Sequence, residues 1–285
     1  MEPLGYSLYT ENKRWTRGIS FMKQYLLTPP HALAAARGWD LPLGHMAFQI
    51  GPEGHLHQAA LPPEVTGGLM LVGLAEPPAG DTPPRQAVQE ILSVCQARAF
   101  LGVVLDLETP PSPYIAQLIT ALQAGLRRSR RGLFLPESYA NFSSQAILYL
   151  SSALSGGSLR QRLQTAVETY GADRLALSLH RASADFFLPS PTGEGRPLSQ
   201  QALRQRMARL EPRVHFSQDL CAHYFTYMSR ETGAHFVLFD DEESLRSKRA
   251  LAQEVGIQRF FWLYPEVEEF LSQLVDQKET HSSLS

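Results

Sequence analysis

The sequence predicts a (β/α)8 barrel, or TIM barrel, built as a single domain with a β-hairpin insertion near its C-terminal end. The chain has 285 residues, which exceeds the roughly 250 that such a barrel requires. Short apolar runs alternate with amphipathic helical patterns seven or eight times along it. Neither a Gly-x-Gly-x-x-Gly nor a P-loop motif follows an early strand, so an open nucleotide-binding sheet has no support.

Composition limits the functions that this barrel can have. The formal net charge is −2, from 26 Lys and Arg against 28 Asp and Glu, so no overall field favours nucleic acid or an anionic membrane as a partner. Cys95 and Cys221 form no Cys-x-x-Cys pair, and we expect neither a metal motif nor a disulfide framework. The start of the chain carries no export signal, which makes a cytoplasmic protein the expectation. No cofactor is expected, and composition leaves the oligomeric state open.

The N-terminal segment, residues 1–40, is the least informative part of the chain. We expect a short first strand at 6–10 and either a strand or a helix at 19–27, because short apolar runs do not settle a period. The barrel is predicted over residues 41–275, with residues 1–40 either included or separate. Residues 276–285 are predicted to be a disordered tail.

From residue 45 the elements follow one another regularly. Glycine- or proline-bounded apolar runs predict buried parallel strands, and apolar residues at helical spacing predict helices between them. Two apolar runs flank Ser229–Arg230–Glu231–Thr232–Gly233 and predict the β-hairpin, at 222–228 and 235–239. The predicted strands are 45–50, 67–74, 100–108, 132–137, 146–152, 175–180 and 259–264; the predicted helices are 85–99, one after Pro113, 159–170, 199–210 and 243–255.

The strand at 100–108 ends on two carboxylates, Asp106 and Glu108. Side chains two apart in a strand project to the same side, so whatever faces one faces the other. In a barrel this position is the carboxyl end of a strand, where catalytic groups gather. A carboxyl group that is partly desolvated beside another charge holds its proton to higher pH, as a general acid for a leaving alkoxide must. Glu108 is the predicted acid.

The stretch Phe100 to Glu108 resembles the fourth-strand sequence of the family 18 glycoside hydrolases, usually Phe-Asp-Gly-Ile-Asp-Leu-Asp-Trp-Glu. Leu101 and Val104 replace the first two Asp residues of that pattern. Asp106 and Glu108 fall on the third Asp and on the acid Glu. The resemblance implies that Glu108 donates the proton and that Asp106 orients the 2-acetamido group of the substrate, which acts as nucleophile in substrate-assisted families.

A second similarity covers residues 235–262. His235 to Lys248 is similar to a family segment of the form Tyr/Phe-Asp-Asp-x-x-Ser-x-x-x-Lys, and this layout is typical of spore-associated, peptidoglycan-directed members. In the family, the final strand ends in a Trp that stacks on a sugar, and the resemblance places Trp262 there. Asp240 and Asp241 could suggest a metal, but adjacent strand residues face opposite sides, and we expect helix capping instead.

One family feature has no counterpart in the predicted strands. The family carries Met-x-Tyr-Asp at the end of its sixth strand, and the predicted counterpart here, Leu177–Ser178–Leu179–His180, lacks the Tyr and the Asp. Tyr139 and Tyr149 are candidates to supply the missing hydroxyl, and the sequence does not choose between them. The predicted substrate-binding residues are Trp262, Glu137, Tyr139 and His180.

The sequence therefore supports three hypotheses. The first is a divergent glycoside hydrolase that cleaves a β-linked glycan containing N-acetylhexosamine, with peptidoglycan-type material ahead of chitin. Its expected partner is this glycan, and no nucleic acid or membrane is expected. The second is a catalytically weak or inactive glycan-binding barrel protein. The third is a barrel enzyme of unrelated chemistry in which the Asp-x-Glu pattern is accidental.

Overall fold

The computed structural model describes residues 24–78, 83–188 and 195–275. The chain forms two compact units, and the barrel strands lie almost wholly in the first of them. The strand predicted at 6–10 and the tail predicted at 276–285 fall outside the described residues. No described helix combines the length and the apolar character that a membrane crossing demands.

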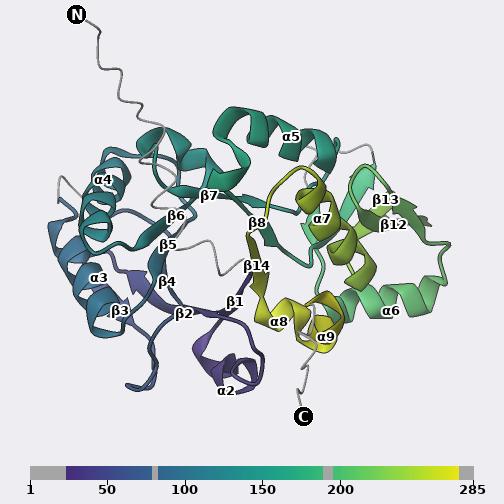
Figure 1. The fold of residues 1–285 in the computed structure, drawn as a ribbon. Coiled ribbons are helices and arrows are strands. Elements are labelled where there is room, and N and C mark those ends of the chain that lie inside the picture. Colours follow the sequence, from purple (N-terminus) through teal and green to yellow (C-terminus); the bar gives the residue numbers. More distant parts are fainter. Residues whose placement is uncertain (1–23, 79–82, 189–194, 276–285) are drawn as a thin grey trace, which may run out of the picture. The chain divides into compact units, whose positions relative to one another are not determined.

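Eight parallel strands close into a barrel, which confirms the predicted fold class (Figure 1). The ring closes because β1 pairs with β2 on one side and with β14 on the other. Going round the ring, the strands are β1 (Gln24–Thr28), β2 (Leu43–Ile50), β4 (Leu69–Leu74), β5 (Gly102–Leu107), β6 (Gly132–Pro136), β7 (Ile147–Ser151), β8 (Leu175–Leu179) and β14 (Phe260–Leu263).

Alternate side chains of these strands fill the barrel. Because successive residues in a strand face opposite sides, one half of each strand points inward and the other half packs outward. The inner set is apolar and buried, and its aromatic rings meet edge to face, as Phe134 and Phe261 do with centroids 5.6 Å apart. The inner residues are Tyr25, Leu27, Leu69, Leu71, Val104, Phe134, Ile147, Ala176 and Phe261.

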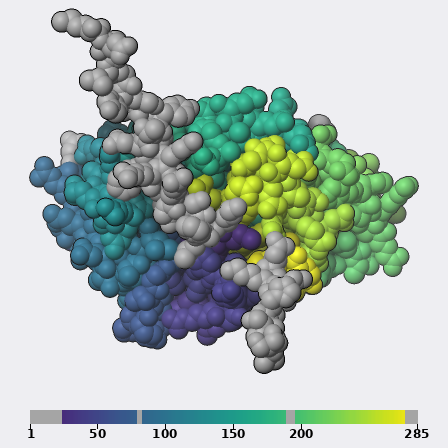
Figure 2. Space-filling view, viewed as in Figure 1, coloured from purple at the N-terminus to yellow at the C-terminus, as the bar shows by residue number. Residues whose placement is uncertain are grey.

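Helices pack around the barrel where the sequence predicts them. In α3 (Arg85–Ala97) and α4 (Pro113–Arg128), apolar residues at helical spacing are buried, and the two helices lie side by side (Figure 1). Ser112 caps α4 by accepting the Ile115 N–H at 3.4 Å. In the space-filling view these two helices form a continuous surface of side chains (Figure 2). The other elements here are η1 (Pro30–Ala32), α2 (Leu33–Ala36), η2 (Glu137–Phe142), α5 (Leu159–Tyr170) and η3 (Ala172–Arg174).

The ring of helices is incomplete beside β2. A short strand, β3 (Leu56–Gln58), follows β2 and pairs with it in the antiparallel sense where a regular barrel would place a helix. Similarly, the short η2 stands between β6 and β7.

The second unit contains a five-stranded antiparallel sheet in the order β10-β9-β13-β12-β11. The predicted hairpin is present as β12 and β13, but it belongs to this larger sheet, which the sequence did not predict. The strands are β9 (Ser183–Leu188), β10 (Arg196–Pro197), β11 (His215–Ser217), β12 (Ala222–Ser229) and β13 (Gly233–Phe239). The remaining helices are α6 (Gln200–Leu210), α7 (Glu242–Glu254), α8 (Tyr264–Val267), η4 (Glu268–Phe270) and α9 (Leu271–Leu274).

Candidate active site

Asp106 and Glu108 lie at the carboxyl end of β5, the fourth strand of the barrel. Val104 belongs to the inner set, so Asp106, two residues further on, shares its inward face, and Glu108 is the first residue after the strand ends at Leu107. Both carboxylates are exposed there. The Glu108 N–H donates to the Leu74 carbonyl at 3.3 Å, which extends the pairing of β5 with β4 beyond the last strand residue. The predicted acid is therefore held by the neighbouring strand.

The hydroxyl of Tyr149 lies beside this pair. Tyr149 is on β7, packs against the inner apolar set, and donates to the Leu105 carbonyl at 3.0 Å. Burial raises the pKa of Tyr149, and the charge of Asp106 together with a hydrogen bond to that carboxylate raises it further. The phenol therefore stays protonated and can donate to an oxygen at the mouth.

The structure corrects the prediction of which residues end the sixth barrel strand. Going round the ring from β1, the sixth strand is β7, and the residues Leu177–His180 end the seventh, β8. Ile147 and Tyr149 share the inward face of β7, at the spacing of the Met and Tyr in the family's Met-x-Tyr-Asp pattern. The Tyr that the sequence comparison found missing has a structural counterpart in Tyr149, whereas Leu150 stands where the pattern has Asp.

Tyr139 and Glu137 both belong to η2, which follows the fifth barrel strand. Tyr139 is buried, burial raises its pKa, and its hydroxyl donates to the carbonyl of Thr109, the residue after Glu108. Tyr139 thus holds the loop that carries Glu108. Glu137 begins η2 and is half-buried. Tyr139 is only 2% exposed, so its main contact is with this loop, whereas the predicted contact of Glu137 with a substrate stays a prediction.

Trp262 does not occupy the predicted stacking position. Its exposed fraction is 0%, and its indole N–H donates to Gln24 Oε1 at 2.9 Å. Its neighbours Phe261 and Leu263 contribute to the inner set, so the alternation of the strand turns Trp262 to the outer side of the barrel. A ring with no exposed face cannot stack on a sugar, and the resemblance to the family misassigned this residue.

His180 belongs to the second unit. It follows β8, its backbone N–H donates to Ser152 Oγ at 3.1 Å, and its Nδ1 lies 3.7 Å from Glu266 Oε2. Its side chain is partly exposed. The structure therefore groups Asp106, Glu108, Glu137, Tyr139 and Tyr149 within the first unit, and places His180 in the other one.

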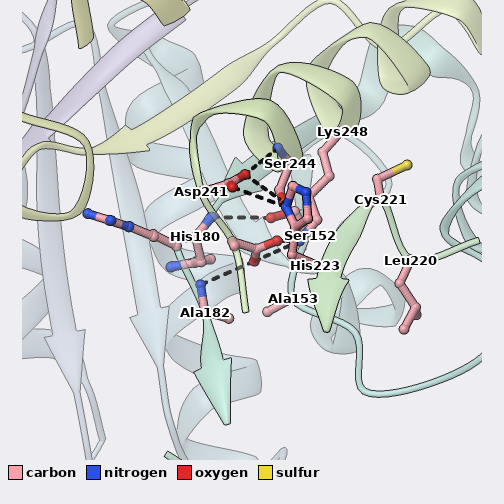
Figure 3. A network of polar contacts seen from close by, with 12 residues as sticks. Ser152, Ala153, His180, Ala182, Leu220, Cys221, His223, Asp241, Ser244 and Lys248 are labelled. Atoms are coloured by element: carbon pink, nitrogen blue, oxygen red, sulfur yellow. Dashed lines mark hydrogen bonds and ion pairs between the residues drawn. The ribbon is translucent and has the colours of Figure 1, made fainter. Parts of the chain in front are cut away.

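The predicted capping role of Asp241 is confirmed. Asp241 is the N-cap of α7 and accepts the Ser244 N–H at 3.0 Å, while His223 approaches the same carboxylate at 3.1 Å (Figure 3). The neighbouring Asp240 is buried and paired with the ammonium of Lys248 at 2.7 Å. Within residues 24–78, 83–188 and 195–275, no group of three or more His, Cys, Asp or Glu side chains is arranged to hold a metal ion.

Leu101 and Val104, which stand where the family pattern has its first two Asp residues, differ in burial. Val104 is buried among the inner apolar residues directly below Asp106, whereas Leu101 is 41% exposed. An apolar side chain beneath Asp106 offers it neither a charge nor a hydrogen bond. Polar support for Asp106 thus comes from Tyr149 rather than from a second carboxylate on its own strand.

Solved structures share this fold, although no family model and no curated protein matches the sequence. The spore cortex-lytic enzyme SleL of Bacillus cereus has a TM-score of 0.62 and 16% identity over 85% of this chain and 70% of its own. A chitinase of Chromobacterium violaceum has a TM-score of 0.62 and 14% identity over 88% of this chain and 99% of its own. The family GH18 chitinase of Cycas revoluta, solved in a complex with allosamidin, has a TM-score of 0.55 and 14% identity, over 84% and 94%. The chain has a divergent form of the fold of the family 18 glycoside hydrolases.

Proposed function

We propose that this protein is a divergent glycoside hydrolase that cleaves a β-linked glycan containing N-acetylhexosamine, with retention and with assistance from the substrate's own acetamido group. The observation that carries the proposal is the position of the two carboxylates at the carboxyl end of the fourth strand, with Asp106 on its inward face and Glu108 directly after its last residue. The shared fold of family 18 chitinases and a spore cortex-lytic enzyme supports the same chemistry.

Each residue at the mouth has a role in this mechanism. Glu108, exposed and held by the Leu74 carbonyl, protonates the glycosidic oxygen as the bond to the leaving sugar breaks. The acetamido oxygen attacks the anomeric carbon. The Asp106 carboxylate accepts a hydrogen bond from the acetamido N–H, and this bond orients and stabilises the acetamido group. The raised pKa keeps the Tyr149 hydroxyl protonated, and this hydroxyl turns from the Leu105 carbonyl to donate a hydrogen bond to the acetamido oxygen. Water then opens the intermediate with Glu108 as base.

Peptidoglycan-type material is the preferred substrate ahead of chitin. SleL, a spore cortex-lytic enzyme, aligns with 85% of this chain. The closing segment from His235 to Lys248 resembles the same class of protein, and its Asp240 and Lys248 form a buried ion pair.

A second candidate function is a catalytically weak or inactive glycan-binding barrel. The burial of Val104 beneath Asp106 favours it, because this apolar contact replaces a carboxylate that tunes Asp106 in the family. Such a protein would bind the glycan at the mouth and leave the glycosidic bond intact.

Substitution of the acid separates the two functions. We expect the wild type to release reporter from N-acetylglucosaminides or to shorten peptidoglycan oligosaccharides, and Glu108→Gln to lower that rate by about 10²–10⁴-fold, the usual contribution of a general acid. Oligosaccharide affinity, measured by calorimetry, should change little. Glu254→Gln, an exposed carboxylate of α7, is the matched control and should keep full activity. Binding without hydrolysis by the wild type would establish the second function, and absence of both would reject each.

A further inference from the structure

A second polar constellation lies in the antiparallel sheet of the second unit. It joins Asp185 on β9, His235 on β13 and Thr232 in the turn that precedes β13. Asp185 and His235 are 5% and 3% exposed, whereas Thr232 is exposed. These three residues have no part in the proposed glycosidase mechanism.

The imidazole of His235 connects the other two side chains in a defined order. Its Nδ1 lies 2.9 Å from Asp185 Oδ1, and its Nε2 lies 2.7 Å from Thr232 Oγ1. An ionised carboxylate can only accept, so the imidazole proton resides on Nδ1 and is donated to Asp185. Nε2 is then the acceptor for the Thr232 hydroxyl. This order of hydroxyl, imidazole and carboxylate is the one that activates a hydroxyl nucleophile.

Two further donors contact the Asp185 carboxylate. Arg206 of α6 forms an ion pair with Asp185 Oδ2, and the Tyr227 hydroxyl donates to the same oxygen at 3.1 Å. Burial raises the pKa of the Tyr227 hydroxyl, and the negative charge of Asp185 raises it further. An ionised Asp185 keeps His235 in the required tautomer and stabilises an imidazolium when one forms.

Aromatic rings fix the orientation of the imidazole. The Tyr227 ring stacks on His235 with centroids 4.4 Å apart and an interplanar angle of 14°, and the Phe187 ring lies 4.6 Å from it. A ring confined in this way cannot turn its Nε2 away from Thr232 without disturbing both neighbours. The base is therefore oriented before any ligand arrives.

The nucleophile, in contrast, is accessible. Thr232 sits in the turn between β12 and β13, where Ser229 Oγ accepts the backbone N–H of Glu231 at 3.3 Å and of Thr232 at 3.4 Å. The side chain of Ser229 thus fixes the turn, and Thr232 is an exposed residue whose hydroxyl contacts His235.

We propose that Thr232, His235 and Asp185 form an acyl-transfer site that accepts small activated carboxylic esters. Thr232 Oγ1 bonds to the ester carbonyl carbon while His235 Nε2 takes the hydroxyl proton. The bond from that carbon to the leaving oxygen breaks, and His235 passes the proton to the departing alcohol. Water, deprotonated by His235, then splits the threonine ester, releases the carboxylic acid and restores the hydroxyl.

The test uses p-nitrophenyl acetate on the full chain, with peptide mass spectrometry to locate the acetyl group. Thr226, an exposed threonine of β12, is the internal control for nonspecific acetylation. We expect acetylation of Thr232 at least about 100-fold faster than of Thr226, consistent with general-base catalysis by one histidine. Equal labelling of the two threonines would overturn the proposal.

Variants at the exposed position test the assignment without disturbing the core. Thr232→Val removes the hydroxyl and should abolish the acetylated peptide, whereas Thr232→Ser keeps it and should retain the reaction. His235→Gln should slow acetylation by at least about 100-fold, and an undiminished rate in that variant would also overturn the proposal. Glu254→Gln, which changes an exposed carboxylate of α7, should acetylate like the wild type.

Discussion

The hydroxyl of Tyr149 lies 3.0 Å from the carbonyl oxygen of Leu105, so the sixth barrel strand reaches the residue that immediately precedes Asp106. This contact brings a phenol to the carboxylate pair from a segment more than 40 residues away in the sequence. Burial and the Asp106 carboxylate raise the pKa of Tyr149, so the hydroxyl keeps its proton throughout the physiological range. The contact therefore makes Tyr149 a hydrogen-bond donor at the mouth.

Tyr149→Phe should lower the hydrolysis rate by roughly tenfold or more, because one donor to a developing charge contributes about 1.4 kcal/mol or more. The ring remains to fill the same apolar space, so the folded state should persist. The rate of oligosaccharide cleavage measures the effect, and the thermal unfolding midpoint reports the fold. Tyr170→Phe, on α5, makes the same chemical change outside the barrel lining and should leave the rate unchanged. An unaltered rate in Tyr149→Phe would remove Tyr149 from the mechanism.

Trp262→Phe should destabilise the protein without affecting glycan affinity. The variant loses the 2.9 Å hydrogen bond to Gln24 Oε1 and leaves space where the larger ring was, so we expect a loss of about 1–3 kcal/mol in the free energy of unfolding. Urea unfolding measures the loss, and calorimetry with an N-acetylglucosamine oligomer measures affinity. Trp39→Phe, at a half-buried position, is the matched control for stability. A large loss of affinity with unchanged stability would restore Trp262 to the binding site.

His45 should make the protein sensitive to mild acid. Burial lowers the pKa of His45 from 6.5 to about 4, so the folded state binds fewer protons than the unfolded state between these values. The free energy of unfolding must then fall as the pH drops from about 6.5 towards 4, and is unaffected by His45 above that window. The shift corresponds to about 3 kcal/mol in total.

His45→Phe tests this linkage, because a phenyl ring preserves packing on Phe100, whose ring centroid is 5.5 Å from that of His45. We expect the wild type to lose about 2–3 kcal/mol more stability than the variant between pH 7.5 and pH 4.5, measured by urea unfolding. His31→Phe, which changes an exposed histidine of η1, is the control and should follow the wild type. Identical pH profiles for wild type and His45→Phe would contradict the assignment.

Local sequence pattern was sufficient for the barrel and for the position of the two carboxylates at the end of its fourth strand. A period of two within residues 100–108 places Asp106 and Glu108 on one face, and repeated strand–helix alternation predicts closure; both depend only on neighbours in the chain. The capping role of Asp241 is local in the same sense, since its partner Ser244 is three residues away.

Tertiary structure alone decided the rest. The run Phe260–Phe261–Trp262–Leu263 is apolar at every position, because a barrel strand is buried on both faces, and so its sequence carries no alternation that distinguishes the inner Phe261 from the outer Trp262. The place of β7 as the sixth strand depends on ring closure between β1 and β2, which is a long-range pairing. Asp185 and His235 are 50 residues apart in the sequence, and they meet because their strands pair in the sheet. The sequence gives the type of each side chain, but the register of the sheet determines which side chains meet.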